Sequence, residues 1–168
     1  IIIGGGLLLT AVGLIGLATL DASSSYLQVV AGLCVASAGM ALAFPAATEA
    51  IVTSLPQDKA GVASAVNDTT REVGAAVGIA LLGSLLTSGY RSSIGNSFDD
   101  LPPEAADAAR DSMGGALQVA NSAPPELQLE LVETARRAFA DGYSLAMLVG
   151  AGMVVAASIV VLRWFPRN

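Results

Sequence analysis

The stretch from Gly142 to Leu162 reads GYSLAMLVGAGMVVAASIVVL and contains no charged side chain. A helix that crosses a hydrocarbon core of about 30 Å needs roughly 20 mostly apolar residues, because each residue adds about 1.5 Å. This stretch meets that length with apolar residues on every face. A strand of a membrane barrel would instead alternate apolar and polar residues over about 10 positions. The sequence therefore predicts a transmembrane helix here.

Three further stretches of the same kind precede it, and they run from Ile1 to Leu20, from Tyr26 to Thr48 and from Val73 to Tyr90. With their flanking residues, the first three helices are expected at about 1–20, 26–54 and 60–90. Only 13% of the 168 residues are charged, whereas about one quarter of a soluble globular domain is charged. We therefore predict an all-α, polytopic transmembrane helix bundle with four membrane-spanning helices in contact with the lipid bilayer.

The connection between the third and fourth predicted helices, residues 93–138, is long and polar. It contains two proline pairs, 102–103 and 124–125, each followed by Glu and a helix-forming stretch. Proline is favoured in the first turn of a helix, so we predict two short surface helices in this loop. Residues 139–168 then form the last transmembrane helix and a short tail. The chain begins inside an apolar helix at Ile1, and we interpret it as a fragment of a longer protein.

The third predicted helix, residues 60–90, carries polar side chains in its opening turns. Asp68, Arg71 and Glu72 are spaced three and four residues apart, so they share one face of a helix, and Asn67 lies beside them. Two interpretations stay open. In one, these residues form a solvated network at the membrane surface, because a helix of about 30 residues is longer than the hydrocarbon core. In the other, Asp68 is protonated from one side of the membrane and releases the proton to the other, which couples proton movement to transport.

Two glycines and a proline add candidate packing and hinge positions. Gly74 and Gly78 form a Gly-x-x-x-Gly pair that lets a partner helix approach closely, and pure packing is as good a reading of this pair as a functional one. In the second helix, Pro45 frees a backbone carbonyl and bends or hinges the helix. Glu49 is the only charge in that apolar stretch, and it either joins the polar network of the third helix or forms a structural salt bridge with Arg71.

Several functional classes lack their usual sequence signals. The chain has no histidine, its only cysteine is Cys34, and we find neither a phosphate-binding glycine loop nor a Cys/His cluster with metal spacing. The net charge of −6, which comes mainly from the long loop, argues against nucleic acid as a partner. We therefore expect no cofactor and no enzymatic activity.

Part of the sequence resembles a known transporter family. The resemblance lies in Gly39-Met-Ala-Leu-Ala-Phe-Pro45, Leu55-Pro56, Gly61-Val-Ala-Ser-Ala-Val-Asn67, Arg71, Gly74 and Gly78-Ile-Ala-Leu-Leu-Gly83. This series resembles the carboxy-terminal part of the major facilitator superfamily, and more narrowly the fourteen-helix drug:proton antiporters of the EmrB/QacA type. The resemblance implies that these are the last four helices of a proton-driven multidrug exporter, a class associated with antibiotic resistance.

The same resemblance implies a location and partners. The chain would lie in a bacterial inner membrane with loop 93–138 outside the cytoplasm and the C-terminus inside, an orientation that the evenly divided basic residues do not decide. Its partners would be the remaining transmembrane helices, amphiphilic small-molecule substrates and protons. The resemblance also makes Gly61 a packing position. A membrane scaffold or partner-binding subunit that acts through its external loop is the alternative.

Overall fold

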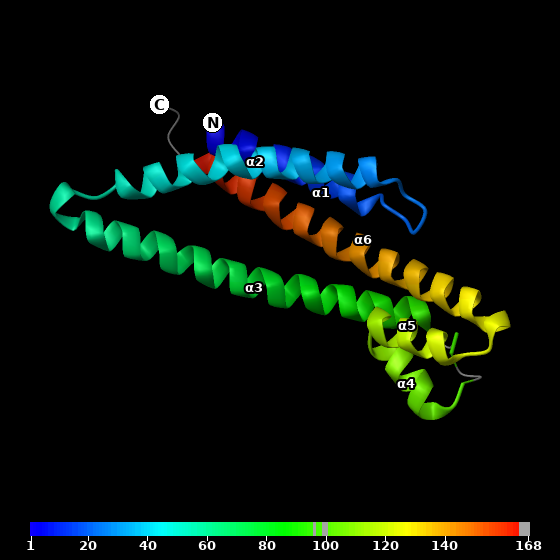
Figure 1. Ribbon diagram of the computed structural model, residues 1–168. Coiled ribbons are helices and arrows are strands. Elements are labelled where there is room, and N and C mark those ends of the chain that lie inside the picture. The colour runs from blue at the N-terminus through cyan, green and yellow to red at the C-terminus, as the bar shows by residue number, and fades with distance from the viewer. Residues whose placement is uncertain (96, 99–100, 165–168) are drawn as a thin grey trace.

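The computed structural model describes residues 1–95, 97–98 and 101–164, and all regular elements in these ranges are helices (Figure 1). In chain order they are α1 (Ile2–Ala18), α2 (Tyr26–Val52), the 3-10 turn η1 (Gln57–Lys59), α3 (Ala60–Ile94), α4 (Pro103–Asp111), α5 (Met113–Ser122) and α6 (Pro125–Trp164). The prediction of an all-α polytopic bundle is confirmed. The predicted short tail begins at Arg163, and its residues 165–168 lie outside the described residues.

Three of the described helices are long and apolar enough to cross a membrane, namely α2, α3 together with η1, and α6. The first helix, α1, is equally apolar but has 17 residues and reaches only about 26 Å. Three of the four predicted spans therefore have the full length, and α1 is a shorter apolar helix packed among them.

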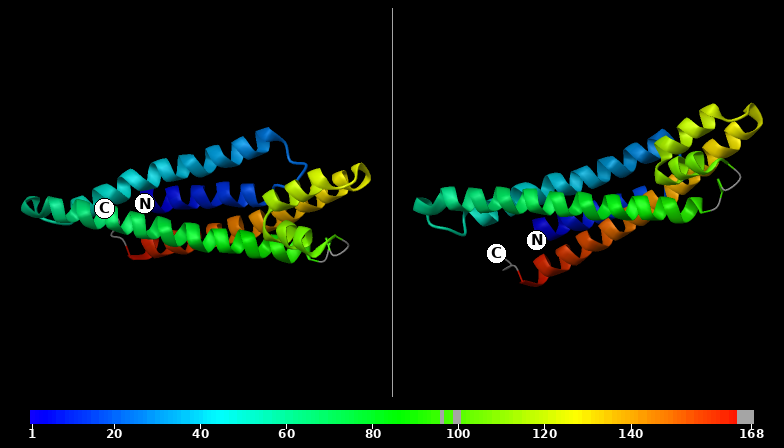
Figure 2. Two further views of the ribbon diagram at one scale, coloured as in Figure 1. Left: turned by 60° about the horizontal axis from the view of Figure 1, so that its bottom comes forward. Right: turned by 90° about the horizontal axis from the view of Figure 1, so that it is seen from below.

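The order of the helices in space differs from their order along the chain. α1 packs against both α2 and α6, and α6 packs against both α1 and α3, so the order in space is α2, α1, α6, α3 (Figures 1 and 2). The short connection between α1 and α2 makes these two helices neighbours. A capping box between Ser25 and Gln28 starts α2 by satisfying backbone donors that a helix N-terminus leaves free.

Small residues bring α1 and α2 into backbone contact. A Cβ atom added at Gly13 would lie 2.4 Å from the backbone nitrogen of Ala36, and one added at Gly39 would lie 2.4 Å from that of Thr10. Across the other side of α1, the buried hydroxyl of Ser158 in α6 donates a hydrogen bond of 2.9 Å to the carbonyl of Gly4. Close approach of this kind is how helices associate in lipid, where hydrophobic burial drives little.

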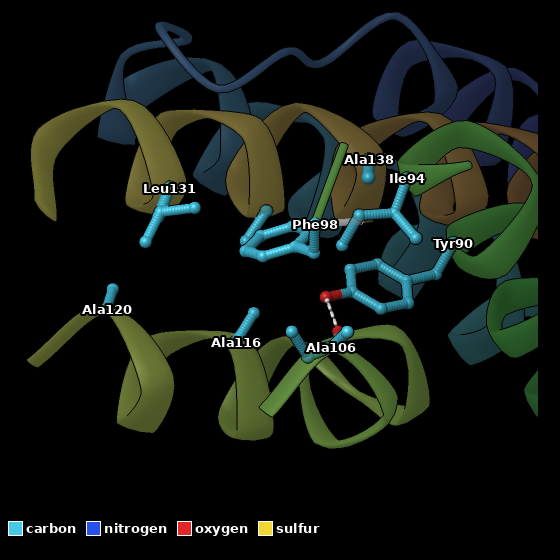
Figure 3. Close-up of a cluster of buried hydrophobic side chains, with 10 residues drawn as sticks. Tyr90, Ile94, Phe98, Ala106, Ala116, Ala120, Leu131 and Ala138 are labelled. Carbon is cyan, nitrogen blue, oxygen red and sulfur yellow. Dashed lines mark hydrogen bonds between the residues drawn. The ribbon is translucent and has the colours of Figure 1, made fainter. Parts of the chain in front are cut away.

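The long connection folds into a helical cap, formed by α4 and α5, which packs on the ends of α3 and α6 (Figure 3). Its apolar core consists of Tyr90, Ile94, Phe98, Ala106, Ala109, Ala116, Ala120, Leu131, Ala135 and Ala138. Tyr90 and Ile94 belong to the last turns of α3, which are buried by this packing. This explains why α3 continues to Ile94, four residues past the predicted end at residue 90.

The positions of the short helices differ from the prediction. Both of them, α4 and α5, lie between the two proline pairs, and the stretch after Pro125 is not a separate surface helix. It forms the first turns of α6, a continuous helix of 40 residues. The physical reason is that residues 126–164 contain no proline, so nothing in the backbone stops the helix where the amphipathic stretch meets the apolar one.

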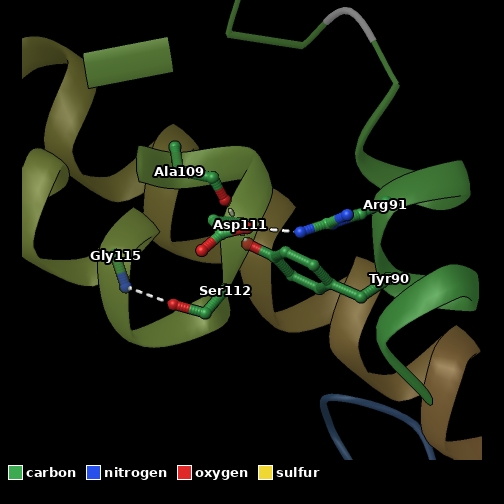
Figure 4. A network of polar contacts seen from close by, with 6 residues as sticks. All are labelled: Tyr90, Arg91, Ala109, Asp111, Ser112 and Gly115. Carbon is green, nitrogen blue, oxygen red and sulfur yellow. Dashed lines mark hydrogen bonds and ion pairs between the residues drawn. The ribbon is translucent and has the colours of Figure 1, made fainter. Parts of the chain in front are cut away.

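Polar contacts join the cap to α3 (Figure 4). The hydroxyl of Tyr90 donates a hydrogen bond of 2.8 Å to the carbonyl of Ala109, close to the end of α4. Arg91 forms an ion pair with Asp111, the last residue of the same helix. Ser112 then starts α5 by accepting a hydrogen bond of 3.1 Å from the backbone N–H of Gly115.

Candidate functional site

The opening turns of α3 form one wall of an open groove of about 730 Å³, at the opposite end of the helix from the cap. The groove is lined by Phe44 from α2 and by Asp68, Arg71, Glu72, Gly74 and Ala75 from α3. Residues 68, 71, 72 and 75 follow the three- and four-residue spacing of one helix face. The structure therefore brings three of the predicted charged residues to one surface.

Arg71 contacts an aromatic ring rather than a carboxylate. Its guanidinium carbon lies 5.2 Å from the centroid of the Phe44 ring, within the range of a cation–π interaction. Among the ion pairs of residues 1–95, 97–98 and 101–164, none joins Arg71 to Asp68 or to Glu72. Arg71 therefore shares a helix face with these carboxylates without pairing with either of them in the described chain.

Asp68 is held by a neutral neighbour. The side-chain amide of Asn67 donates a hydrogen bond of 3.2 Å to the Asp68 carboxylate, and Asn67 itself is buried, with 6% of its surface exposed. Asp68 and Glu72 take part in no ion pair in the described part of the chain. The groove thus presents two carboxylates that share it with Arg71 but form no ion pair with it in the described chain.

The two candidate residues of α2 lie apart from this arrangement. Pro45 is inside α2, which continues through it, and its missing N–H leaves the carbonyl of Ala41 without its usual helical donor. Glu49 is exposed one turn further along, is not among the residues lining the groove, and pairs with Arg71 nowhere in the described chain. A shared network of Glu49 with the residues of α3 stays a prediction.

The three glycines singled out on α3 are not packed against other helices of this chain. A Cβ atom added at Gly61, Gly74 or Gly78 would meet no described atom within 4 Å. The glycine-rich face of α3 is therefore open, in contrast to Gly13 and Gly39 at the α1–α2 contact. Any role of Gly74 and Gly78 in helix packing therefore requires a helix other than those described in this chain.

Phe44 and Ala75 line the groove and were not among the candidate site residues. A signal for Phe44 is present in the sequence, because it is an aromatic residue directly before Pro45, on the helix joined to the charged one by a short connection. An aromatic face beside two carboxylates attracts a cation through both the ring quadrupole and the negative charges. The side chains of the groove thus combine an aromatic face with carboxylates, which is a chemistry that attracts cations.

Comparison with known proteins points to efflux pumps. No family model matches the chain. It is 35% identical over 162 residues to the multidrug efflux pump LfrA of Mycolicibacterium smegmatis, a match that covers 96% of this chain and 32% of the relative. It is also 35% identical over 165 residues to the methyl viologen resistance protein SmvA of Salmonella typhimurium, with the same coverage.

A third relative is the tetracenomycin C resistance and export protein of Streptomyces glaucescens, which is 31% identical over 167 residues, or 94% of this chain and 30% of the relative. The chain spans about a third of the length of these curated relatives. Their names describe efflux, export and resistance and no enzyme. The chain is therefore similar to a segment of drug efflux proteins, and its apolar helices are those of a multi-pass membrane protein.

Proposed function

We propose that this chain is the C-terminal part of a proton-coupled multidrug efflux transporter of the major facilitator superfamily, of the EmrB/QacA type. The observation that carries the proposal is the groove, in which Asp68 and Glu72 lie beside Phe44 and form no ion pair in the described chain. The similarity to efflux proteins over nearly the whole chain supports it. A membrane scaffold finds no such support in the names of these relatives.

The proposed site exchanges one positive charge for another. A carboxylate in a membrane protein is costly unless it is protonated, paired or hydrated. Asp68 therefore holds either a proton or the cationic group of the substrate, and binding of the substrate on one side of the membrane accompanies release of the proton. Asn67 positions Asp68 through the hydrogen bond of 3.2 Å. An amphiphilic organic cation fits this site, and one relative is named for resistance to methyl viologen, which is an organic dication.

The remaining parts of the proposal concern the whole protein. The open glycine face of α3, with Gly74 and Gly78, is the surface on which helices of the longer transporter pack. Transport in this class proceeds by movement of helical bundles around a central site, so these helices alone are not expected to transport. We place the cap and loop 93–138 outside the cytoplasm and the C-terminus inside, in a bacterial inner membrane.

The test is transport of a fluorescent cationic dye into inverted membrane vesicles that contain the full-length protein, which is the direction that corresponds to efflux from the cell. Wild type, Asp68→Asn and Glu49→Gln are compared at equal abundance in the membrane, because Asn and Gln keep the shape of the side chain and remove its charge. We expect Asp68→Asn to lose proton-driven efflux and Glu49→Gln to retain it. Unchanged efflux in Asp68→Asn would assign these charges to a structural role at the membrane surface, and no efflux from wild type would refute the drug assignment.

A further inference from the structure

We propose that the ring of Phe44 is the binding surface for the cationic group of the substrate, and that Arg71 covers this ring while the site is empty. Arg71 is then an intramolecular competitor of the substrate. This inference rests on the proposed function, and it concerns how the same groove admits an organic cation.

The guanidinium of Arg71 contacts an aromatic ring although carboxylates lie nearby. Asp68 lies three residues before Arg71 on the same helix face, and Glu72 is the next residue, so the guanidinium has carboxylates within reach of its long side chain. Instead it lies over the Phe44 ring at 5.2 Å and forms no ion pair with either carboxylate in the described chain. The ring of Phe44 is therefore already occupied by a cation, one that the protein supplies itself.

The ring of Phe44 is accessible from the groove. Phe44 remains 48% exposed despite this contact, and it lines the groove together with both carboxylates. Arg71 is also exposed and takes part in no ion pair in the described chain, so its flexible side chain can leave the ring without breaking a salt bridge. A cation that enters the groove can take the place of the guanidinium on the ring and make a cation–π contact of its own.

The consequence of this exchange is a preference for flat or delocalised cations. A guanidinium is planar and stacks on aromatic faces, whereas an ammonium is a compact and strongly hydrated charge. A ring face that accepts Arg71 therefore suits planar organic cations, and the carboxylates of Asp68 and Glu72 supply the opposite charge. The competing Arg71 side chain sets a threshold, because only a cation that binds the ring better than Arg71 can displace it.

The experiment measures the affinity of a cationic dye, ethidium, for the purified full-length protein in lipid nanodiscs, by fluorescence anisotropy. The variants are Arg71→Gln, Phe44→Leu, Phe44→Tyr and the double variant Arg71→Gln/Phe44→Leu. Arg91→Gln is the matched control, because it removes an arginine from the opposite end of the same helix, where Arg91 pairs with Asp111. Exposed cation–π contacts are worth a factor of about two to five in affinity.

We expect Arg71→Gln to bind ethidium about two to five times more tightly than wild type, and Arg91→Gln to bind it as wild type does. Phe44→Leu should weaken binding by a smaller factor, because it removes the ring from the substrate and from Arg71 alike, while Phe44→Tyr, which keeps a ring, should bind as wild type does. In the double variant the gain from Arg71→Gln should disappear. A gain that persists without the ring would show simple charge repulsion by Arg71 and would overturn the inference.

Two further outcomes separate this inference from the function on which it rests. If wild type binds and exports ethidium but Arg71→Gln binds it no more tightly, Arg71 is not a competitor and the proposed function stands. If wild type neither binds nor exports organic cations, the proposed function itself fails and this inference fails with it.

Discussion

Replacing Tyr90 by Phe tests how the cap is fastened to the transmembrane helices. Tyr90 is 2% exposed, and its hydroxyl donates to the carbonyl of Ala109 at 2.8 Å. That carbonyl belongs to the last turn of α4, where carbonyl groups lack a partner within the helix. Removing the donor leaves a buried acceptor unsatisfied, which costs about 1 to 2 kcal/mol. Opening of α4 should therefore become roughly 5 to 30 times more frequent.

The assay is amide hydrogen exchange of the full-length protein, read on peptides that cover residues 103–111. Exchange in these peptides should speed up by that factor in Tyr90→Phe, while peptides from α1 and α2 should exchange as in wild type. Tyr26→Phe is the matched control, since Tyr26 is 83% exposed. Unchanged exchange in residues 103–111 would refute the view that this hydrogen bond holds α4 in place.

Two other predictions concern packing and pH. Gly142→Ala would place a Cβ atom 2.5 Å from the carbonyl oxygen of Leu86 in α3. We therefore expect a loss of about 1 to 3 kcal/mol in stability, seen as a lower melting temperature. Gly152→Ala in the same helix is the control, because its added Cβ atom would meet no described atom of another helix within 4 Å and the variant should melt like wild type. In the connection between α1 and α2, hydrogen bonds from Ser23 and then Ser24 lower the pKa of Asp21 below its ordinary 3.8. The ionised form thus stabilises this turn above pH 3.8, and that contribution is lost as the pH falls through the lowered pKa. An NMR titration of the Asp21 carboxyl should show the low pKa in wild type and a rise toward 3.8 in Ser23→Ala, and an unshifted wild-type value would contradict it.

The sequence predicts the four long helices of this chain well, because each of them contains a long uncharged stretch. Their order in space could not be predicted in the same way. The insertion of α6 between α1 and α3 depends on contacts such as Ser158 with Gly4, residues that are 154 positions apart. Nothing in the local pattern of either residue reveals this pairing.

The cap shows a second limit of sequence patterns. The proline pairs correctly indicate helices in the long loop, but they give no sign that alanines such as Ala109 and Ala116 form a buried core with Tyr90 and Phe98. Small side chains have weak patterns in sequence because they suit surfaces and tight cores alike. The continuation of α6 through the expected end of the loop has a different reason. A proline stops a helix, whereas a change from an amphipathic to an apolar stretch does not.

The candidate site could be predicted only in part. The spacing of Asp68, Arg71 and Glu72 places them on one face, which the groove displays. The spacing does not reveal the partner of Arg71, because the Phe44 ring that attracts its guanidinium comes from another helix. Periodicity describes one helix at a time, whereas the site is made by two.

We propose that the full-length protein exchanges protons for organic cations, and the most direct test is transport by the purified protein in liposomes. Methyl viologen uptake is measured after an imposed pH gradient, acidic inside, in wild type and in Asp68→Asn. We predict uptake that requires the gradient, stops when a protonophore collapses it, and is absent in Asp68→Asn. Uptake by wild type that is the same with and without the gradient, or no uptake at all, would contradict the account.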